Sequence, residues 1–206
     1  MVMLDDFLAA LPRAEGADGV IATCTDGYAA IYTAEYRTKY NPFLIVEING
    51  EGPEKWPPKG MTFNPGPYVI SISDELAPGV SGLLDASHKR PWGVDRVEVV
   101  DYSERFAPFY KGASASASGS VAEGREIWIN SCFSCHDLPE AGLGGTKAAR
   151  PMQIVMMQAV YNPDYFNRYV RAPSTINPSA KMTAHPHYSN EQLDGLREFL
   201  RMLSNP

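Results

Sequence analysis

The sequence predicts an α+β protein in which a small β-rich α+β domain is joined by a flexible linker to an all-α domain. Short β-branched runs that end at turn dipeptides fill residues 1–111, a run of Gly, Ala and Ser occupies residues 112–120, and helical spacing with capping motifs dominates residues 121–206. A chain of 206 residues is long enough for two domains of this size.

The first domain is expected to open with a helix and to continue with short strands. Apolar residues recur at helical spacing over residues 4–11, before Pro12. The expected strands are residues 19–24, 43–48, 68–72 and 94–100. The first two runs end at Asp26-Gly27 and Asn49-Gly50, which are strong turn dipeptides. Residues 50–67 are rich in Pro and Gly, so we expect them to be irregular.

The second domain carries three helix signals. Ser120 and Glu123 match a capping box, and Ser189 and Gln192 match a second one that opens an amphipathic helix. Residues 162–170 suggest a third helix with Pro at its first position. These signals indicate an all-α architecture.

Charge and hydropathy exclude two function classes. The net charge is −6, and all of the excess negative charge lies in residues 1–111, which argues against nucleic-acid binding. The chain has no run near the ~18 apolar residues of a membrane span, so we expect no transmembrane segment. The N-terminus lacks the pattern of a signal peptide, which is expected of a cytosolic protein or of a mature exported one.

The motif Cys132-Phe-Ser-Cys135-His136 is the attachment signal for c-type haem. Two cysteines three apart can bond both vinyl groups of one porphyrin, and the next histidine then supplies the proximal iron ligand. A Cys-x-x-Cys pair also occurs in thioredoxin-type redox disulfides and in zinc sites. A thioredoxin-type disulfide needs a βαβ context, and a zinc site would need a second ligand pair. The motif therefore favours haem.

Residues about 118–206 resemble a class I cytochrome c domain. Gly124-Arg-Glu-Ile-Trp128 is similar to the N-terminal helix signature of that family, and Leu196-Arg-Glu-Phe199-Leu200 to its C-terminal partner. The resemblance implies that the two helices cross closely, with glycine where the backbones meet. A glycine inside a helix costs about 1 kcal/mol relative to alanine, and a close contact would account for that cost at Gly124.

The same resemblance implies the remaining ligands. Pro178-Ser-Ala-Lys-Met182 is similar to the family's loop that brings the sixth, methionine ligand, with His185 and His187 as rivals. The family fixes the proximal histidine through a proline carbonyl, which implies a cofactor-binding role for Pro151. The alternative for Pro151 is that it merely starts a helix. Arg150 stands where the family has glycine.

These expectations describe an electron carrier rather than an enzyme. We expect one covalent haem c, iron ligation by His136 and Met182, and redox protein partners. Because c-type haem is attached outside the cytoplasm, we expect a periplasmic or otherwise extracytoplasmic location. The alternatives are a haem enzyme or small-ligand sensor with a labile sixth ligand, and the haem subunit of a larger molybdopterin-type oxidoreductase.

Residues about 18–100 faintly resemble part of a sulfite-oxidase-type molybdopterin domain. The likeness lies in residues 22–28, 43–50 and 66–70. The molybdenum-binding cysteine of that family lies upstream of this run, so the resemblance implies a truncated fold without the cofactor, used as a docking module. We expect Cys24 to be a small core residue and His88 to be a surface residue.

Overall fold

The computed structural model describes residues 1–12, 15–148 and 150–204. The chain divides into two compact units, Met1–Arg105 and Phe106–Pro206. The first is mixed α and β and the second is helical, so the chain as a whole combines α and β structure as expected.

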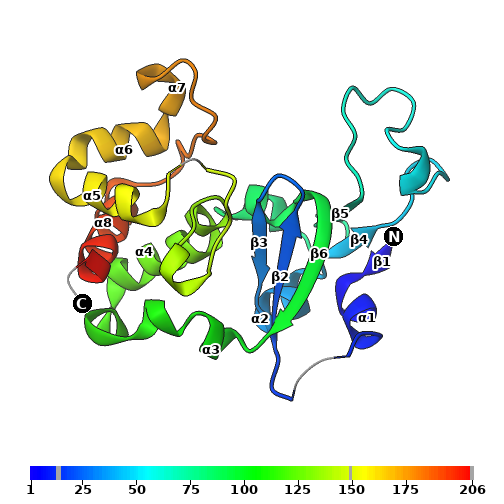
Figure 1. Ribbon diagram of the computed structural model, residues 1–206, viewed down its shortest axis with the longest axis horizontal. Helices are drawn as coiled ribbons and strands as arrows, with labels where there is room; N and C mark the ends of the chain where they lie inside the picture. Colours follow the sequence, from blue (N-terminus) through cyan, green and yellow to red (C-terminus); the bar gives the residue numbers. More distant parts are fainter. Residues whose placement is uncertain (13–14, 149, 205–206) are drawn as a thin grey trace. The chain divides into compact units, whose positions relative to one another are not determined.

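Within the described residues, the first unit forms a six-stranded antiparallel sheet with the order β1-β4-β5-β6-β2-β3 (Figure 1). The strands are β1 (Val2–Met3), β2 (Gly19–Cys24), β3 (Ala29–Tyr32), β4 (Phe43–Ile45), β5 (Tyr68–Ser71) and β6 (Trp92–Val100). The helices are α1 (Leu4–Ala9), α2 (Ala34–Tyr40), α3 (Tyr102–Arg105) and the 3₁₀ turns η1 (Pro53–Lys55), η2 (Val80–Gly82) and η3 (Ala86–Lys89). The expected first helix and four strands are confirmed, whereas β1, β3 and α2 were not expected.

Turn chemistry places the strands of this sheet. Asp26-Gly27 lies between β2 and β3, which pair in register with Val20 opposite Tyr32. At the second turn, Asn49 and Gly50 both adopt positive φ, and Ile48 and Glu51 exchange two backbone hydrogen bonds of 2.9 and 3.1 Å.

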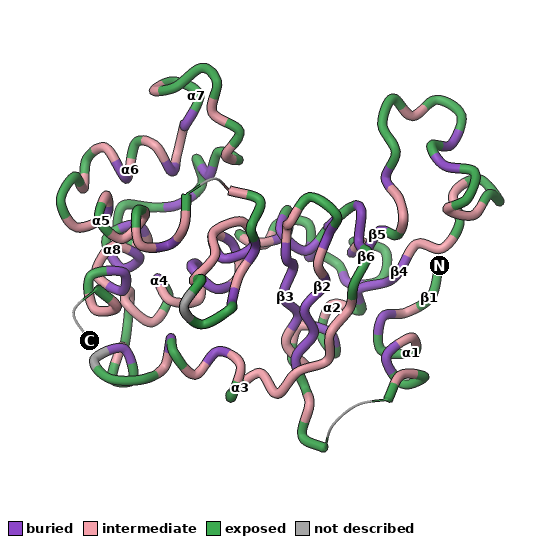
Figure 2. Tube along the Cα trace, viewed as in Figure 1, coloured by how far each residue is buried: buried purple, intermediate pink, exposed green. Residues whose placement is uncertain are grey.

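The core of the first unit lies under β2, β3 and the strands beside them. Figure 2 shows β2 and β3 as mostly buried. Apolar side chains of α1 and of the sheet form one buried cluster: Leu4, Leu8, Val20, Ala22, Cys24, Ala30, Tyr32, Leu44, Ile70 and Val94. Burial of these side chains removes apolar area from water and so stabilises the sheet.

The second unit is built from helices. They are η4 (Ala107–Tyr110), η5 (Gly112–Ser116), α4 (Gly119–Asn130), η6 (Cys132–Ser134), η7 (Pro139–Ala141), α5 (Met152–Tyr161), α6 (Pro163–Arg171), α7 (Pro173–Ile176) and α8 (Asn190–Ser204). The Ser189 box is confirmed, since Gln192 N donates to Ser189 Oγ at 3.1 Å and Ser189 N donates to Gln192 Oε1 at 2.9 Å. The prediction of a capping box at Ser120 is wrong, because α4 begins at Gly119 and has Ser118 as its N-cap.

The unit boundary differs in position from the expected linker. It falls between Arg105 and Phe106, whereas residues 112–116 form η5 and Gly119 begins α4. Two hydrogen bonds hold the backbone around Ser114 in this conformation. Ser114 Oγ donates to the Lys111 carbonyl at 2.6 Å, and Arg125 Nη1 donates to the Ser114 carbonyl at 3.0 Å.

Helices α4 and α8 cross in direct backbone contact. A Cβ added to Gly124 would lie 2.5 Å from the Gly195 carbonyl oxygen, and a Cβ added to Gly195 would lie 2.5 Å from the Ser120 carbonyl carbon. The close crossing expected for Gly124 is therefore confirmed. The second glycine, Gly195, was not anticipated, because its place in the apolar pattern of α8 marks it only as small.

Candidate functional site

The two cysteines and the histidine of the Cys-x-x-Cys-His motif lie on one tight turn after α4. Cys135 N and His136 N both donate to the Cys132 carbonyl, at 3.1 and 3.0 Å. Both cysteines are half-buried, and among the described residues none of the three cysteines forms a disulfide. The turn therefore presents two thiols and an imidazole from a single short segment.

Burial, together with the nearby Cys135, raises the pKa of the Cys132 thiol to about 12. The thiol is therefore protonated at neutral pH, unlike the activated thiolate of a redox dithiol. The described part of the chain also gathers no group of three or more His, Cys, Asp or Glu side chains that could hold a metal ion.

The His136 ring is oriented by a backbone carbonyl. His136 Nδ1 lies 2.7 Å from the Arg150 carbonyl oxygen, a distance at which Nδ1–H donates. Burial lowers the pKa of His136, an effect that this hydrogen bond partly opposes. The imidazole is therefore neutral near pH 7, with its proton on Nδ1.

The carbonyl that faces His136 corrects the expectation for Pro151. The acceptor is one residue earlier, at Arg150. The Pro151 carbonyl instead accepts from Ile154 N at 3.1 Å, because Pro151 is the N-cap of α5. Pro151 therefore starts a helix, and this start places the preceding carbonyl against the imidazole.

Aromatic side chains surround the turn. The Trp128 ring stacks on His136 with 6.2 Å between centroids and 27° between planes. Phe133, inside the motif, packs edge-on against Phe109 at 5.0 Å. Trp128 is fully buried, and its Nε1 lacks a hydrogen-bond partner among the described residues. A buried N–H is costly unless it is paired, so this nitrogen favours an additional polar group at the site.

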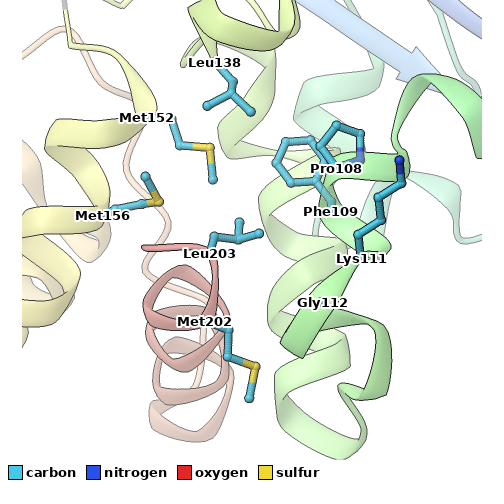
Figure 3. A pocket seen from close by; sticks show the side chains of 9 residues that line it. All are labelled: Pro108, Phe109, Lys111, Gly112, Leu138, Met152, Met156, Met202 and Leu203. Carbon is cyan, nitrogen blue, oxygen red and sulfur yellow. The ribbon is translucent and has the colours of Figure 1, made fainter. Parts of the chain in front are cut away.

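An apolar cavity of about 240 Å³ lies beside these aromatics in the same unit (Figure 3). Its lining comes from η4, the start of η5, α5, the C-terminal turns of α8 and the loop after the motif: Pro108, Phe109, Lys111, Gly112, Leu138, Met152, Met156, Met202 and Leu203. The lining includes none of the predicted haem-binding residues, which are Cys132, Cys135, His136, Pro151 and Met182. Phe109 lines the cavity and also packs edge-on against Phe133 of the motif.

The predicted sixth ligand lies on a separate segment. Met182 is half-buried in the loop between α7 and α8. Of its rivals, His185 is buried and His187 is exposed. Burial, followed by the charge of His187, lowers the pKa of His185 to about 4. The His185 ring stacks on Tyr188 at 5.1 Å, which engages one face of this imidazole in packing.

These residues fit a covalently attached porphyrin. The motif turn places two half-buried thiols on one segment, the carbonyl of Arg150 fixes the tautomer of His136, and the surroundings are apolar and aromatic. Haem needs such apolar surroundings together with one oriented imidazole.

The first unit places its candidate residues in a core rather than in a site. Cys24 is buried in the cluster under the sheet, as expected of a small core residue. The expectation that His88 lies on the surface is wrong. His88 is buried, and its Nδ1 lies 2.8 Å from Tyr28 Oη, because η3 folds the basic segment back onto the sheet.

Lys89, beside His88, is also buried and was missed from the sequence. Its Nζ donates to the Ile31 carbonyl, lies 3.5 Å from Asp85 Oδ2 and sits 5.0 Å from the centre of the Tyr36 ring. The single signal in the sequence is Asp85 four residues before Lys89, a spacing that more often marks an exposed ion pair.

In the part of the chain that the structure describes, no helix has the length and apolar character needed to cross a membrane. Comparison with protein families, curated proteins and solved structures gives no match for this chain.

Proposed function

We propose that this chain is an extracytoplasmic electron-transfer protein that carries one c-type haem. Cys132 and Cys135 would form the two thioether bonds, and His136 and Met182 would be the axial ligands. The observation that carries the proposal is the hydrogen bond of 2.7 Å from His136 Nδ1 to the Arg150 carbonyl, formed on a Cys-x-x-Cys-His turn. It orients the imidazole as an iron-ligating histidine requires.

The haem would supply reversible one-electron chemistry, and the chain would supply its environment. The carbonyl of Arg150 polarises the Nδ1–H of His136 and would thereby make Nε2 a stronger electron donor to the iron. Met182 would close the other axial position, so that substrates and gases have no open iron site. Thioether ligation and apolar surroundings both favour the lower charge of ferrous iron, and we therefore expect a positive midpoint potential.

The location and the partners follow from the same proposal. Attachment of c-type haem occurs outside the cytoplasm, which supports a periplasmic or otherwise exported protein. Cys24 is a core residue in a strand and would therefore not bind molybdenum. The first unit would instead act as a docking module for a redox partner.

The covalent part of the proposal is tested by production of the chain together with a c-type haem maturation system. The wild type and a Cys24→Ser control should carry one haem that resists acidic organic extraction. Cys132→Ser and Cys135→Ser should each lose at least one thioether bond, which denaturing mass spectrometry and the pyridine haemochrome spectrum detect. A wild-type chain that remains haem-free, or whose haem is extractable, would contradict the proposal.

The electron-transfer part is tested by the sixth ligand. Met182→Ala should open the iron and permit carbon monoxide binding to the reduced protein, which the wild type should resist. Thr183→Ala, at an exposed residue of the same loop, is the matched control and should behave as the wild type. Ready binding by the wild type would favour the haem enzyme or gas-sensor alternative, and a strongly negative midpoint potential would contradict ligation by Met182.

A further inference from the structure

The loop that carries Met182 is anchored just beyond this residue, at His185 and Tyr188. His185 N donates to the Val170 carbonyl on α6 at 3.0 Å. The guanidinium of Arg171 donates twice to the Tyr188 carbonyl, from Nε at 3.1 Å and from Nη2 at 3.0 Å. These bonds hold the end of the loop against α6.

One further bond joins this loop to the haem-attachment turn. Tyr188 Oη donates to Ser131 Oγ at 2.9 Å, and both residues are buried, with 2% and 1% exposure. Ser131 directly precedes Cys132 and is itself fixed, because its N–H donates to the Ile127 carbonyl of α4 at 3.0 Å. The bond therefore links the segment of the proposed sixth ligand to the segment of the proposed fifth ligand.

The position of this bond suggests more than general packing. The Tyr188 ring is already held by its stack on His185 at 5.1 Å and by the edge of His187 at 4.6 Å. Removal of the hydroxyl alone would leave these ring contacts in place and would leave Ser131 Oγ buried without this partner. A buried hydrogen bond of this kind resists separation of the two segments that it joins.

We propose that Tyr188 is a positioning residue that holds the Met182 loop against the haem-attachment turn through its hydrogen bond to Ser131. This inference rests on the proposed function. Tyr188 would act through the loop and not as an iron ligand. It sets how often Met182 leaves the iron, and thereby how well the site excludes external ligands.

The test is an imidazole titration of the haem-loaded, full-length ferric protein. Imidazole binds only after Met182 has left, so its apparent Kd is inversely proportional to the open fraction. Loss of one buried hydrogen bond should raise that fraction about five- to tenfold. Tyr188→Phe should therefore bind imidazole about five- to tenfold more tightly, and Tyr161→Phe, at a tyrosine that is 82% exposed on α5, should match the wild type.

A second variant removes the same bond from its other end. Ser131→Ala leaves the aromatic stack untouched and should tighten imidazole binding as much as Tyr188→Phe does. Ser131→Thr retains a hydroxyl and should restore the wild-type affinity. The double variant Tyr188→Phe/Ser131→Ala should bind no more tightly than either single variant, because both changes remove one interaction.

The outcomes separate the inference from the proposed function. The inference is overturned if Tyr188→Phe lowers the unfolding temperature but leaves the imidazole Kd unchanged, since Tyr188 is then only structural. Additive effects of the two variants would overturn it as well. A wild-type ferric protein without the far-red sulfur-to-iron band would instead overturn the ligation by Met182, and the inference with it.

Discussion

The crossing of α4 and α8 gives a quantitative prediction for Gly124→Ala. The new Cβ would lie 2.5 Å from the Gly195 carbonyl oxygen, about 1 Å short of an ordinary carbon–oxygen contact. The obstructing atoms belong to the backbone, so the helices must separate. Overpacking of this kind costs about 3 kcal/mol, and alanine recovers about 1 kcal/mol through its higher helix propensity. The expected net loss is about 2 kcal/mol.

Thermal unfolding followed by circular dichroism measures this loss. For a unit of about 100 residues, 2 kcal/mol corresponds to a fall in Tm of about 8–16 °C. Gly82→Ala is the control, because a Cβ there would meet nothing within 4 Å and the backbone φ is not positive. An unchanged or higher Tm for Gly124→Ala would refute the close crossing, since helix propensity alone would then decide the result.

Three further predictions concern the second unit. Ser189→Ala should cost about 1 kcal/mol by loss of its capping bond to Gln192, measured by urea unfolding with the exposed Ser204→Ala as control; equal midpoints would contradict it. Because the pKa of His185 falls to about 4 on folding, unfolded chains bind the extra proton first, and stability should fall as pH drops from about 6.5 to about 4. His185→Phe should flatten this pH dependence of the urea midpoint, and an unchanged slope would exclude His185 as its source. The Cys132 thiol of haem-free protein should react with iodoacetamide at pH 8 at least tenfold more slowly than in the urea-unfolded chain, because folding raises its pKa to about 12; equal rates would show that it is not buried.

Local chemistry made much of this fold predictable. The β-branched run over Gly19–Cys24, the turn at Asn49-Gly50 and the Ser189 capping box are each determined by neighbours in sequence, and each was expected. β3 and α2 were missed, because residues 29–40 mix small, aromatic and charged side chains without a clear period. Whether these residues form a strand or a helix is decided by pairing with β2 and by packing on the sheet, which are tertiary contacts.

The candidate site was predictable as a motif but not as a geometry. The spacing of Cys132, Cys135 and His136 is read directly from the sequence, whereas the choice of the Arg150 carbonyl over that of Pro151 depends on where α5 starts. The bond between Tyr188 and Ser131 joins residues 57 positions apart, and neither residue type predicts such a contact. Similarly, the Gly/Ala/Ser composition of residues 112–120 predicts a flexible linker and gives no sign of the hydrogen bond from Arg125 to the Ser114 carbonyl.

The most direct test of the central claim is the optical spectrum of the haem-loaded protein, recorded oxidised, reduced, and reduced under carbon monoxide. Ligation by His136 and Met182 predicts sharp reduced bands, a weak far-red sulfur-to-iron band in the oxidised protein and no response to the gas. Broad bands that shift when carbon monoxide is added would contradict the electron carrier, because they would show an open or labile sixth position.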